Sequence, residues 1–590
     1  MLKSFNLNII LIFFLLVISS CKNERKEIDK GLLNTNSEKE DKRPVFKQNH
    51  VFSPSLVEYY LQQVTDSVER LSSTDKVGGM EKIALTIYKL RNYKPVWELY
   101  EKRSNLPVQY LDLLDTVYFE GLDAEDYAFE DLKKYRQQVL YDNNEKGHAD
   151  RVEAKAFNAA IGDFHYTVSF LKLLHHLKRG KINPNDLGLN WLIAKNTEVN
   201  SNYLISLAHQ QNNLSAALDT VSSKHEHYYS MKKLLKQYYE LNKNQHWKAF
   251  PPGNVLSLGS VSDRVLILRQ NLCLTQDLDC YNLNDPENSL FDKELQNAVS
   301  SFQSRHRLQP TGIVDERFIK EMNIPINERI KLISNNLERL RWLPDTLGKK
   351  YILINIPDFK LKLFNNDEEI LEMKIIVGKT SHSTPVFSDK VEYVTFSPYW
   401  NVPQSIAQNE LLPKIKKNER FLFRNRFEVI DSWDTNAIFI NPRDIDWEVF
   451  DKDYFPYKLR QKPGPWNALG KVKFMFPNDY DIYIHDTPEK HLFLKQQRDF
   501  SSGCIRVEKP FELAKFLLPE LSAEEILTKM DGFEEENITL KNPVPVHIVY
   551  LTVLVDNKGR AIFREDLYGM EEKLNTALRK EKTLKNTGKN

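Results

Sequence analysis

The spacing of apolar residues changes part-way along this chain, and that change restricts its fold more than any other feature. From residue 54 to about residue 250, apolar side chains recur at intervals of three and four, as in the segment that begins at Ala156 and stops at Gly180 and Pro184. From residue 350 onward, "KYILINIPDFKLKLF" and "EILEMKIIVGK" alternate apolar and polar residues, which is the pattern of half-buried strands. The chain is therefore predicted to be a multidomain α+β protein, helical first and mostly β afterwards.

The chain has 590 residues, too many for a single hydrophobic core, so several domains are expected. After "PPG" (251–253), short amphipathic helices are predicted around the turn Pro310-Thr311-Gly312. A stretch rich in basic and aromatic residues later interrupts the strands, which indicates an insertion in the sheet. The predicted order is a helical scaffold domain (51–250), a small three-helix domain (251–325), a linker helix (326–348), a mostly-β domain (349–570) with an insertion at 404–462, and a charged tail (571–590).

The first 21 residues have the pattern of an export signal. Lys3 precedes an uninterrupted apolar run from Ile9 to Ile18, which is too short to span a bilayer. Ile18-Ser19-Ser20-Cys21 resembles a bacterial lipobox, in which the cysteine becomes the lipidated first residue after cleavage. The alternative is an ordinary signal peptide cut near the serines. We predict a lipoprotein signal peptide at 1–21 and a disordered, charged tether at 22–50.

This N-terminus predicts an exported protein that acyl chains hold at a membrane surface. The expected location is the periplasmic face of the cell envelope of a Gram-negative bacterium. The net charge of the chain is only +1, from 82 basic and 81 acidic residues, with no large basic block. We therefore expect no nucleic-acid partner.

Export changes the interpretation of the other cysteines. Cys273 and Cys280 lie seven residues apart and can form a disulfide in an oxidising compartment, with two reduced thiols as the alternative. Cys504 then has no partner. An unpaired cysteine in an exported protein is a candidate reactive thiol, and the alternative is an inert cysteine in the core.

The segment "IHDTPEKHLFLKQQRDFSSGCIRV" holds the groups that nucleophilic catalysis needs. His485 is expected at the end of a strand, and Gly503 allows a tight turn that brings the backbone close to whatever Cys504 attacks. Neighbouring strand ends would bring His485 to Cys504 as a thiolate–imidazolium pair, in which the imidazole lowers the pKa of the thiol.

Two further groups complete this predicted site. The amides of Gly503 and Cys504 are expected to form an oxyanion hole. Arg506 shares the face of Cys504 by the two-residue period of a strand, so it is expected to meet a substrate carboxylate.

These residues also resemble a known family. "H…SSGCIRV" resembles the active site of the YkuD-type L,D-transpeptidases, and "NLERLRWLP", "INIPDFKL", "YWNVP", "PGPWNALGKVKFMFPN" and "HDTP" resemble its large scaffold-bearing branch. Ser502 departs from the pattern, because a histidine is usual before the glycine. The segment "AVSSFQSRHRLQPTG" resembles the three-helix peptidoglycan-binding domain, and the alternative is that this domain only packs against its neighbours. The substrate-binding residues expected from the resemblance are Arg506, Ser502, Ser501, Tyr483, Trp400 and Asn467.

The resemblance implies a reaction. Cys504 would attack the carbonyl of the third residue, a diamino acid, in a peptidoglycan tetrapeptide stem and release D-Ala. A side-chain amine of a neighbouring stem would then resolve the thioester and form a 3→3 cross-link, without metal or organic cofactor. The insertion at 404–462 matches a capping subdomain that would exclude water, and carbapenems are the expected acylating inhibitors.

Two other functions stay open on the sequence. A hydrolase of the same fold, either an L,D-carboxypeptidase or an amidase that cleaves cross-links, would use water as the acceptor. A non-catalytic lipoprotein would only anchor the membrane to peptidoglycan.

Overall fold

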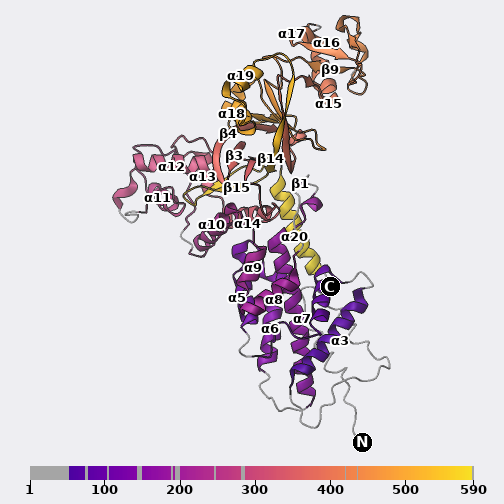
Figure 1. The fold of residues 1–590 in the computed structure, drawn as a ribbon. Coiled ribbons are helices and arrows are strands. Elements are labelled where there is room, and N and C mark those ends of the chain that lie inside the picture. The colour runs from indigo at the N-terminus through magenta and orange to yellow at the C-terminus, as the bar shows by residue number, and fades with distance from the viewer. Residues whose placement is uncertain are drawn as a thin grey trace.

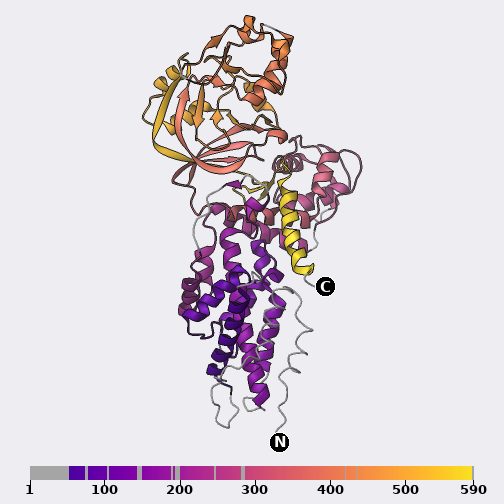
Figure 2. The same cartoon turned by 90° about the vertical axis from the view of Figure 1, so that its right-hand side faces the viewer.

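The computed structural model describes residues 52–72, 77–101, 105–141, 149–187, 191–192, 199–244, 247–280, 286–418, 420–434 and 436–587. The predicted signal peptide, the charged tether and Cys21 lie outside these residues. Within them, no helix is both long enough and apolar enough to cross a membrane. The molecule is elongated, with a helical domain at one end, a small inserted domain at the other and a β-rich domain between them (Figures 1 and 2).

The N-terminal part is a helical domain built around one long helix, α7 (Ala149–Arg179). Its core is centred on Asp163, a buried carboxylate that accepts hydrogen bonds from the amides of Val96 (2.7 Å) and Trp97 (2.8 Å) and from the Tyr88 hydroxyl (2.6 Å). These bonds hold the loop after α4, which carries Val96 and Trp97, against α7. The other elements are α3 (Pro54–Ser72), α4 (Gly79–Leu90), α5 (Leu106–Asp115), η1 (Val117–Glu120), η2 (Ala124–Tyr127), α6 (Phe129–Tyr141), η3 (Pro184–Leu187), α8 (Ser201–Gln211), α9 (Ser215–Val221) and α10 (Glu226–Lys243).

Three helices with their own core form the next domain: α11 (Arg264–Leu274), α12 (Lys293–Arg305) and α13 (Glu316–Met322), with η4 (Pro286–Ser289) before α12. The Gln303 side chain fixes the turn after α12, because its amide donates to the Ile313 carbonyl (2.9 Å) and its oxygen accepts from the Gly312 amide (2.9 Å). Gly312 has φ +67°, and a Cβ there would lie 2.6 Å from Cγ of Gln296. The turn therefore requires glycine.

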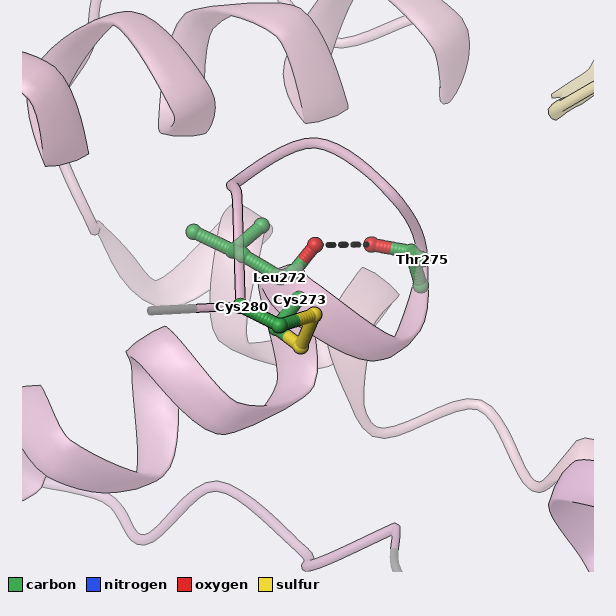
Figure 3. The surroundings of a disulfide bond; sticks show 4 residues. All are labelled: Leu272, Cys273, Thr275 and Cys280. Atoms are coloured by element: carbon green, nitrogen blue, oxygen red, sulfur yellow. Dashed lines mark hydrogen bonds between the residues drawn. A yellow bond between two sulfur atoms is a disulfide. The ribbon is translucent and has the colours of Figure 1, made fainter. Parts of the chain in front are cut away.

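A disulfide joins Cys273 at the end of α11 to Cys280, and it closes a loop whose first turn is fixed by a bond from the Thr275 hydroxyl to the Leu272 carbonyl (Figure 3). This loop presents Asp277, whose carboxylate is fully buried. Asp277 pairs with Arg305 of α12 and, at 3.2 Å, with Arg560 of the β-rich domain. The loop thus docks the three-helix domain onto its neighbour.

Helix α14 (Ile326–Arg341) connects the helical scaffold to the last helix of the chain through buried charges. Arg341 pairs with Glu338 (3.2 Å) and also reaches Glu120 of the scaffold. Arg339 pairs with Glu571 of the last helix, α20 (Met570–Thr587). The segment predicted as a charged tail is therefore mostly a helix, and its first turn packs against α14.

The β-rich domain is a sheet that closes on itself. Its path runs β5-β10-β11-β13-β4-β3-β2-β14, and β14 pairs with both β2 and β5, while β12 pairs with β4 and β1 with β5. Alternate residues of the strands fill its core, and α18 and α19 pack against that core. The elements are β1 (Trp191–Leu192), β2 (Lys350–Asn355), β3 (Lys360–Asn365), β4 (Glu368–Gly378), η5 (Thr380–His382), β5 (Val386–Phe396), β10 (Val472–Met475), β11 (Ile484–His485), η9 (Lys490–Leu494), β12 (Asp499–Ser501), β13 (Ile505–Val507), α18 (Pro510–Leu517), α19 (Ala523–Met530), β14 (Glu536–Val549) and the hairpin β15 (Val553–Val555) and β16 (Ala561–Phe563).

A separate small domain, the cap, is inserted between β5 and β10, at the far end of the molecule from the scaffold (Figure 1). It has its own hydrophobic core and a four-stranded sheet in the order β6-β9-β7-β8. Its first and last strands pair with each other, so the inserted unit extends from Trp400 to Gln461. Its elements are β6 (Trp400–Asn401), α15 (Gln404–Ile406), the π-helical turn η6 (Ala407–Leu411), α16 (Leu412–Lys417), α17 (Phe421–Arg424), β7 (Phe427–Ile430), β8 (Phe439–Ile440), η7 (Pro442–Asp444), η8 (Trp447–Val449) and β9 (Lys458–Gln461).

Candidate active site

Two short parallel strands bring the predicted site residues together. Strands β11 and β13 pair Ile484 with Ile505 and His485 with Arg506. Both isoleucines are completely buried in the core. Since side chains alternate along a strand, Tyr483, His485, Cys504 and Arg506 project from the opposite face.

The turn that carries Cys504 depends on two glycines in close contact. Gly503 has φ +116°, which is unfavourable for other residues, and a Cβ there would lie 3.0 Å from Ile482. Gly378 at the end of β4 packs against it, since a Cβ on Gly378 would lie 3.1 Å from the Gly503 Cα and 2.1 Å from the His382 carbonyl oxygen. A side chain at either position would displace the turn.

Hydrogen bonds from three hydroxyl groups hold the same turn. The Thr384 hydroxyl donates to the Gly503 carbonyl (2.7 Å) and accepts from the Gly378 amide (2.9 Å). The Ser501 hydroxyl donates to the Cys504 carbonyl (2.6 Å), and the Tyr568 hydroxyl donates to the Gly378 carbonyl (2.6 Å). The turn that carries this candidate nucleophile, named the nucleophile turn below, is therefore fixed by the fold itself.

The position of one proton on His485 follows from its contacts. Nδ1 lies 2.6 Å from the carbonyl oxygen of Asp486. A carbonyl oxygen can only accept, so Nδ1 carries the proton and Nε2 is left as the basic nitrogen. Burial lowers the pKa of His485 to about 3, and the nearby Arg506 contributes in the same direction. His485 is thus a neutral base at physiological pH.

Cys504 is also neutral in this structure. Burial raises the pKa of its thiol to about 11, although the Tyr483 amide and hydroxyl and the Arg506 guanidinium favour the thiolate. The thiol points at the Asp481 carbonyl, 3.7 Å away, and no hydrogen bond to His485 is found in the described part of the chain. Burial therefore favours the neutral forms of both Cys504 and His485 in this structure.

The expected oxyanion hole is partly occupied. The Gly503 amide donates to the Ser501 hydroxyl at 3.3 Å, a long bond. For the Cys504 amide, no acceptor is found among the described residues. The Cys504 amide is therefore the donor that the structure leaves for a developing oxyanion, and the Tyr483 hydroxyl lies close to the thiol.

Arg506 is held beside the site by an acid. One of its terminal nitrogens donates to Glu489 at 2.6 Å, and its Nε has no hydrogen-bond partner within the described residues. The ring of Tyr483 lies 5.6 Å from that of His485. Burial and the neighbouring thiol both raise the pKa of Tyr483, so it stays a protonated donor.

The remaining predicted substrate-binding residues have other surroundings. Ser502 is exposed at the turn, whereas Ser501 is buried and holds the backbone. Trp400 packs into the cap core, with its ring 6.0 Å from that of Phe427. Asn467 is completely buried, and its amide donates to the carbonyls of Pro398 (2.9 Å) and Lys462 (3.0 Å). Asn467 thus joins the two chain segments that lead into the cap, and substrate contact by Asn467 and Trp400 stays a prediction.

Several residues that the sequence analysis did not single out also belong to the site. Gly378, Thr384 and Tyr568 support the nucleophile turn from distant parts of the chain, so no local motif indicates them. Lys473 pairs with His485 across β10 and β11. The alternation of "KVKFMF" predicts its face, but the pairing of two strands is needed to place it beside His485.

Comparisons with known proteins identify the domain that holds this site. A model described as "L,D-transpeptidase catalytic domain", of the YkuD family, matches residues 349–546. The chain carries an L,D-transpeptidase catalytic domain. Models described as "Scaffold domain" and "Putative peptidoglycan binding domain" match residues 84–235 and 274–322. The YkuD-type domain is thus joined to the helical scaffold and to the three-helix domain.

Individual proteins are also similar to this chain. A protein of Haemophilus influenzae named "Putative L,D-transpeptidase" is 35% identical over 260 residues, which are 44% of this chain and 50% of that protein. The chain thus spans about half the length of this curated relative.

Solved structures are more distant. One, titled as the avibactam carbamoyl enzyme of Ldtfm, is 10% identical with a TM-score of 0.17 and covers 38% of this chain and 64% of its own. Another is a fused Zn-dependent amidase/peptidase/peptidoglycan-binding domain protein from Clostridium acetobutylicum, which is 13% identical with a TM-score of 0.14. The match covers 50% of this chain and 100% of that one.

Proposed function

We propose that this protein is a peptidoglycan L,D-transpeptidase that forms 3→3 cross-links through a thioester on Cys504. The observation that carries the proposal is the pairing of β11 with β13, which sets Cys504 and the unprotonated Nε2 of His485 on one face within a YkuD-type domain. The proposed donor is a tetrapeptide stem with a diamino acid in third position. The acceptor is a side-chain amine of another stem.

The first half-reaction forms the thioester. Nε2 of His485 takes the thiol proton as Sγ attacks the carbonyl carbon of the third residue. The negative charge that develops on the carbonyl oxygen is stabilised by the Cys504 amide and the Tyr483 hydroxyl. The C–N bond then breaks, and the nitrogen of the departing D-Ala takes the proton from His485.

The second half-reaction reverses these proton transfers. The acceptor amine attacks the thioester carbon and gives a proton to Nε2. The C–S bond breaks, and Cys504 regains its proton from His485. Since both groups begin and end neutral, no charge separation has to be stored in the buried resting site.

The other domains support peptidoglycan as the substrate. The three-helix domain matches a peptidoglycan-binding model, which favours the cell envelope as the location. The cap is proposed to cover the thioester and exclude water, so that an amine rather than water resolves it. No basic region in the sequence favours a nucleic acid as partner.

We further propose that a lipid on Cys21 anchors the protein to a membrane on its periplasmic side in a Gram-negative bacterium. The support is the apolar run before Ile18-Ser19-Ser20-Cys21 and the charged segment after it. A Cys21→Ala variant should then leave the membrane fraction after cell fractionation. Its retention there, at the wild-type level, would contradict the anchor.

The test of the reaction is incubation with a disaccharide tetrapeptide and mass spectrometry of the products. A dimer linked 3→3, with one D-Ala released per cross-link, is expected from the wild type and not from Cys504→Ala. Tripeptide alone would indicate a hydrolase of the same fold. Absence of both products and of any adduct on Cys504 would indicate a non-catalytic wall-binding protein.

A further inference from the structure

A row of polar side chains crosses the active face of the sheet beside His485. Strand register pairs His485 with Arg506 on one side and with Lys473 of β10 on the other. Paired residues project from the same face, with Cβ atoms about 5 Å apart. His485 therefore lies between two cations, and only one of them, Arg506, is on the strand that follows Cys504.

The two cations differ in what already neutralises them. Arg506 donates to Glu489 at 2.6 Å. Lys473 is also mostly buried, with 19% of its side chain exposed, but the acid nearest to it, Glu535, is 4.0 Å away. Glu535 in turn accepts a 2.7 Å hydrogen bond from the Tyr399 amide at the base of the cap. Lys473 is thus a mostly buried ammonium with a distant acid partner, next to the proposed catalytic base.

The order of these residues across the sheet matches the order of groups in the scissile segment. Cys504 lies at β13, His485 on β11 and Lys473 on β10. In the donor, the acyl carbon bonds the nucleophile and the leaving nitrogen takes its proton from His485. The carboxylate of the leaving residue is two bonds beyond that nitrogen. A donor laid across the strands in this direction brings the carboxylate to Lys473.

We propose that Lys473 binds the free α-carboxylate of the residue that leaves, and so selects stems that end directly after the scissile bond. This inference rests on the proposed transpeptidase function and names a specificity residue for it. An ammonium forms a charge-assisted hydrogen bond with a carboxylate. A stem with one residue more has an amide at this position and would leave the ammonium without its anion.

The experiment compares two donors, the disaccharide tetrapeptide and the same molecule with a C-terminal amide. The wild type should prefer the carboxylate form by about 30-fold in kcat/KM, the order expected for one charge-assisted bond. Lys473→Met should lose this preference and Lys473→Arg should keep most of it. Retention of the preference in Lys473→Met would overturn the proposal.

A control separates carboxylate binding from a structural ion pair. Glu535→Gln removes the partner of Lys473 and leaves the ammonium in place, so the preference should persist. If Glu535→Gln loses the preference as Lys473→Met does, Lys473 acts through the ion pair and the proposal is wrong. Lys374→Met removes a lysine from β4 that has a similarly long ion pair, 3.7 Å to Glu508, and should keep the preference.

Binding measurements distinguish failure of this inference from failure of the proposed reaction. In Cys504→Ala, the Kd of the two donors should differ as kcat/KM does, and Lys473→Met should remove the difference. If the wild type turns over neither donor but this Lys473-dependent difference in Kd is found, the reaction is wrong and the carboxylate site stands. If no difference in Kd is found, the carboxylate site is wrong whatever the turnover.

Discussion

At the scale of single residues, the thiol of Cys504 and the imidazole of His485 are both neutral in the resting site. A thiolate and an imidazolium in a buried place need strong mutual contact, and here Cys504 and His485 do not form a hydrogen bond in the described structure. Burial instead raises the pKa of the thiol and lowers that of the imidazole. In the proposed mechanism, proton transfer accompanies attack, once the substrate carbonyl has excluded water and aligned the reacting atoms.

The first prediction concerns the reactivity of Cys504 toward iodoacetamide, which reacts with the thiolate. With the pKa of the thiol raised to about 11, the thiolate fraction increases as pH rises toward that value. The alkylation rate should therefore rise about tenfold for each pH unit between 7 and 10. Mass spectrometry of the labelled protein at each pH measures this rate.

The control for this prediction is His485→Ala. Because no ion pair with His485 activates the resting thiol, its alkylation profile should keep the same slope. A wild-type rate that is already constant between pH 6 and 8, and that falls in His485→Ala, would show a thiolate–imidazolium pair instead.

At the scale of elements, the nucleophile turn is held by segments far from it in sequence. Thr384 precedes β5, yet its hydroxyl joins the Gly503 carbonyl to the Gly378 amide. This bridge joins the end of β4 to the nucleophile turn, where Gly378 and Gly503 are in contact. The strand end of β4 and the turn before β13 thus behave as one rigid unit.

The second prediction tests this bridge. Thr384→Val keeps the shape of the side chain but leaves the Gly378 amide and the Gly503 carbonyl without a partner, at a cost of about 1–3 kcal/mol. We expect a lower Tm and a rate of Cys504 acylation reduced about tenfold. Thr384→Ser, which retains the hydroxyl, should stay near the wild type. A wild-type acylation rate in Thr384→Val would contradict the role of the bridge.

The sequence allowed prediction of those parts of the fold that depend on local patterns. The change from helical to strand spacing indicated an α+β chain, and the family resemblance extended this to a scaffold, a peptidoglycan-binding domain and an L,D-transpeptidase domain. Asn467 shows the limit of such reasoning. A motif indicated its position as important, but only the three-dimensional packing shows that its amide is used inside the protein.

The sequence alone predicted neither the protonation states of the site residues nor the pairing of the strands beside them. The spacing of His485 and Cys504 indicates nothing of how deeply each is buried, and burial decides their protonation. In the same way, Lys473 becomes a neighbour of His485 only through the register of β10 against β11. A shift of one residue would move it to the other face.

At the scale of the whole molecule, buried ion pairs connect domains whose cores are separate. The disulfide loop places Asp277 between Arg305 of its own domain and Arg560 of the β15–β16 hairpin. Such a contact favours one arrangement, because separating the domains would break the Asp277–Arg560 pair, although Arg305 stays with Asp277 and Arg560 with Asp556. The three-helix domain is thereby held beside the catalytic domain.

The third prediction follows from that contact. Asp277→Asn removes the buried carboxylate of Arg305 and one of the two acids that pair with Arg560, and it should lower the free energy of unfolding by about 3 kcal/mol. Asp279→Asn changes the same charge at an exposed position of the same loop and should have an effect below about 0.5 kcal/mol. Denaturant unfolding monitored by intrinsic fluorescence measures both. Equal effects of the two substitutions would contradict a docking role for Asp277.

An ion pair joins the cap to the residue after β4 that supports the nucleophile turn. Glu410 in the π-helical turn of the cap lies 3.8 Å from Lys379, and the Lys379 amide donates to the Ser501 carbonyl (3.0 Å). Both charged side chains are more than 40% exposed, so the pair is weak. A weak contact of this kind suits a cap that must open for each substrate.

The last prediction uses this pair to test whether the cap protects the proposed thioester. Glu410→Lys places two like charges together and should favour the open cap, so water reaches the adduct more often. We expect the carbapenem adduct on Cys504 to be lost about threefold faster than in the wild type, the order expected for an exposed pair. The double swap Lys379→Glu with Glu410→Lys restores opposite charges and should restore the lifetime. Mass spectrometry of the intact protein over time measures each adduct. Equal lifetimes in the single and double variants would mean that this ion pair does not control access of water, because only the sign of the contact differs between them.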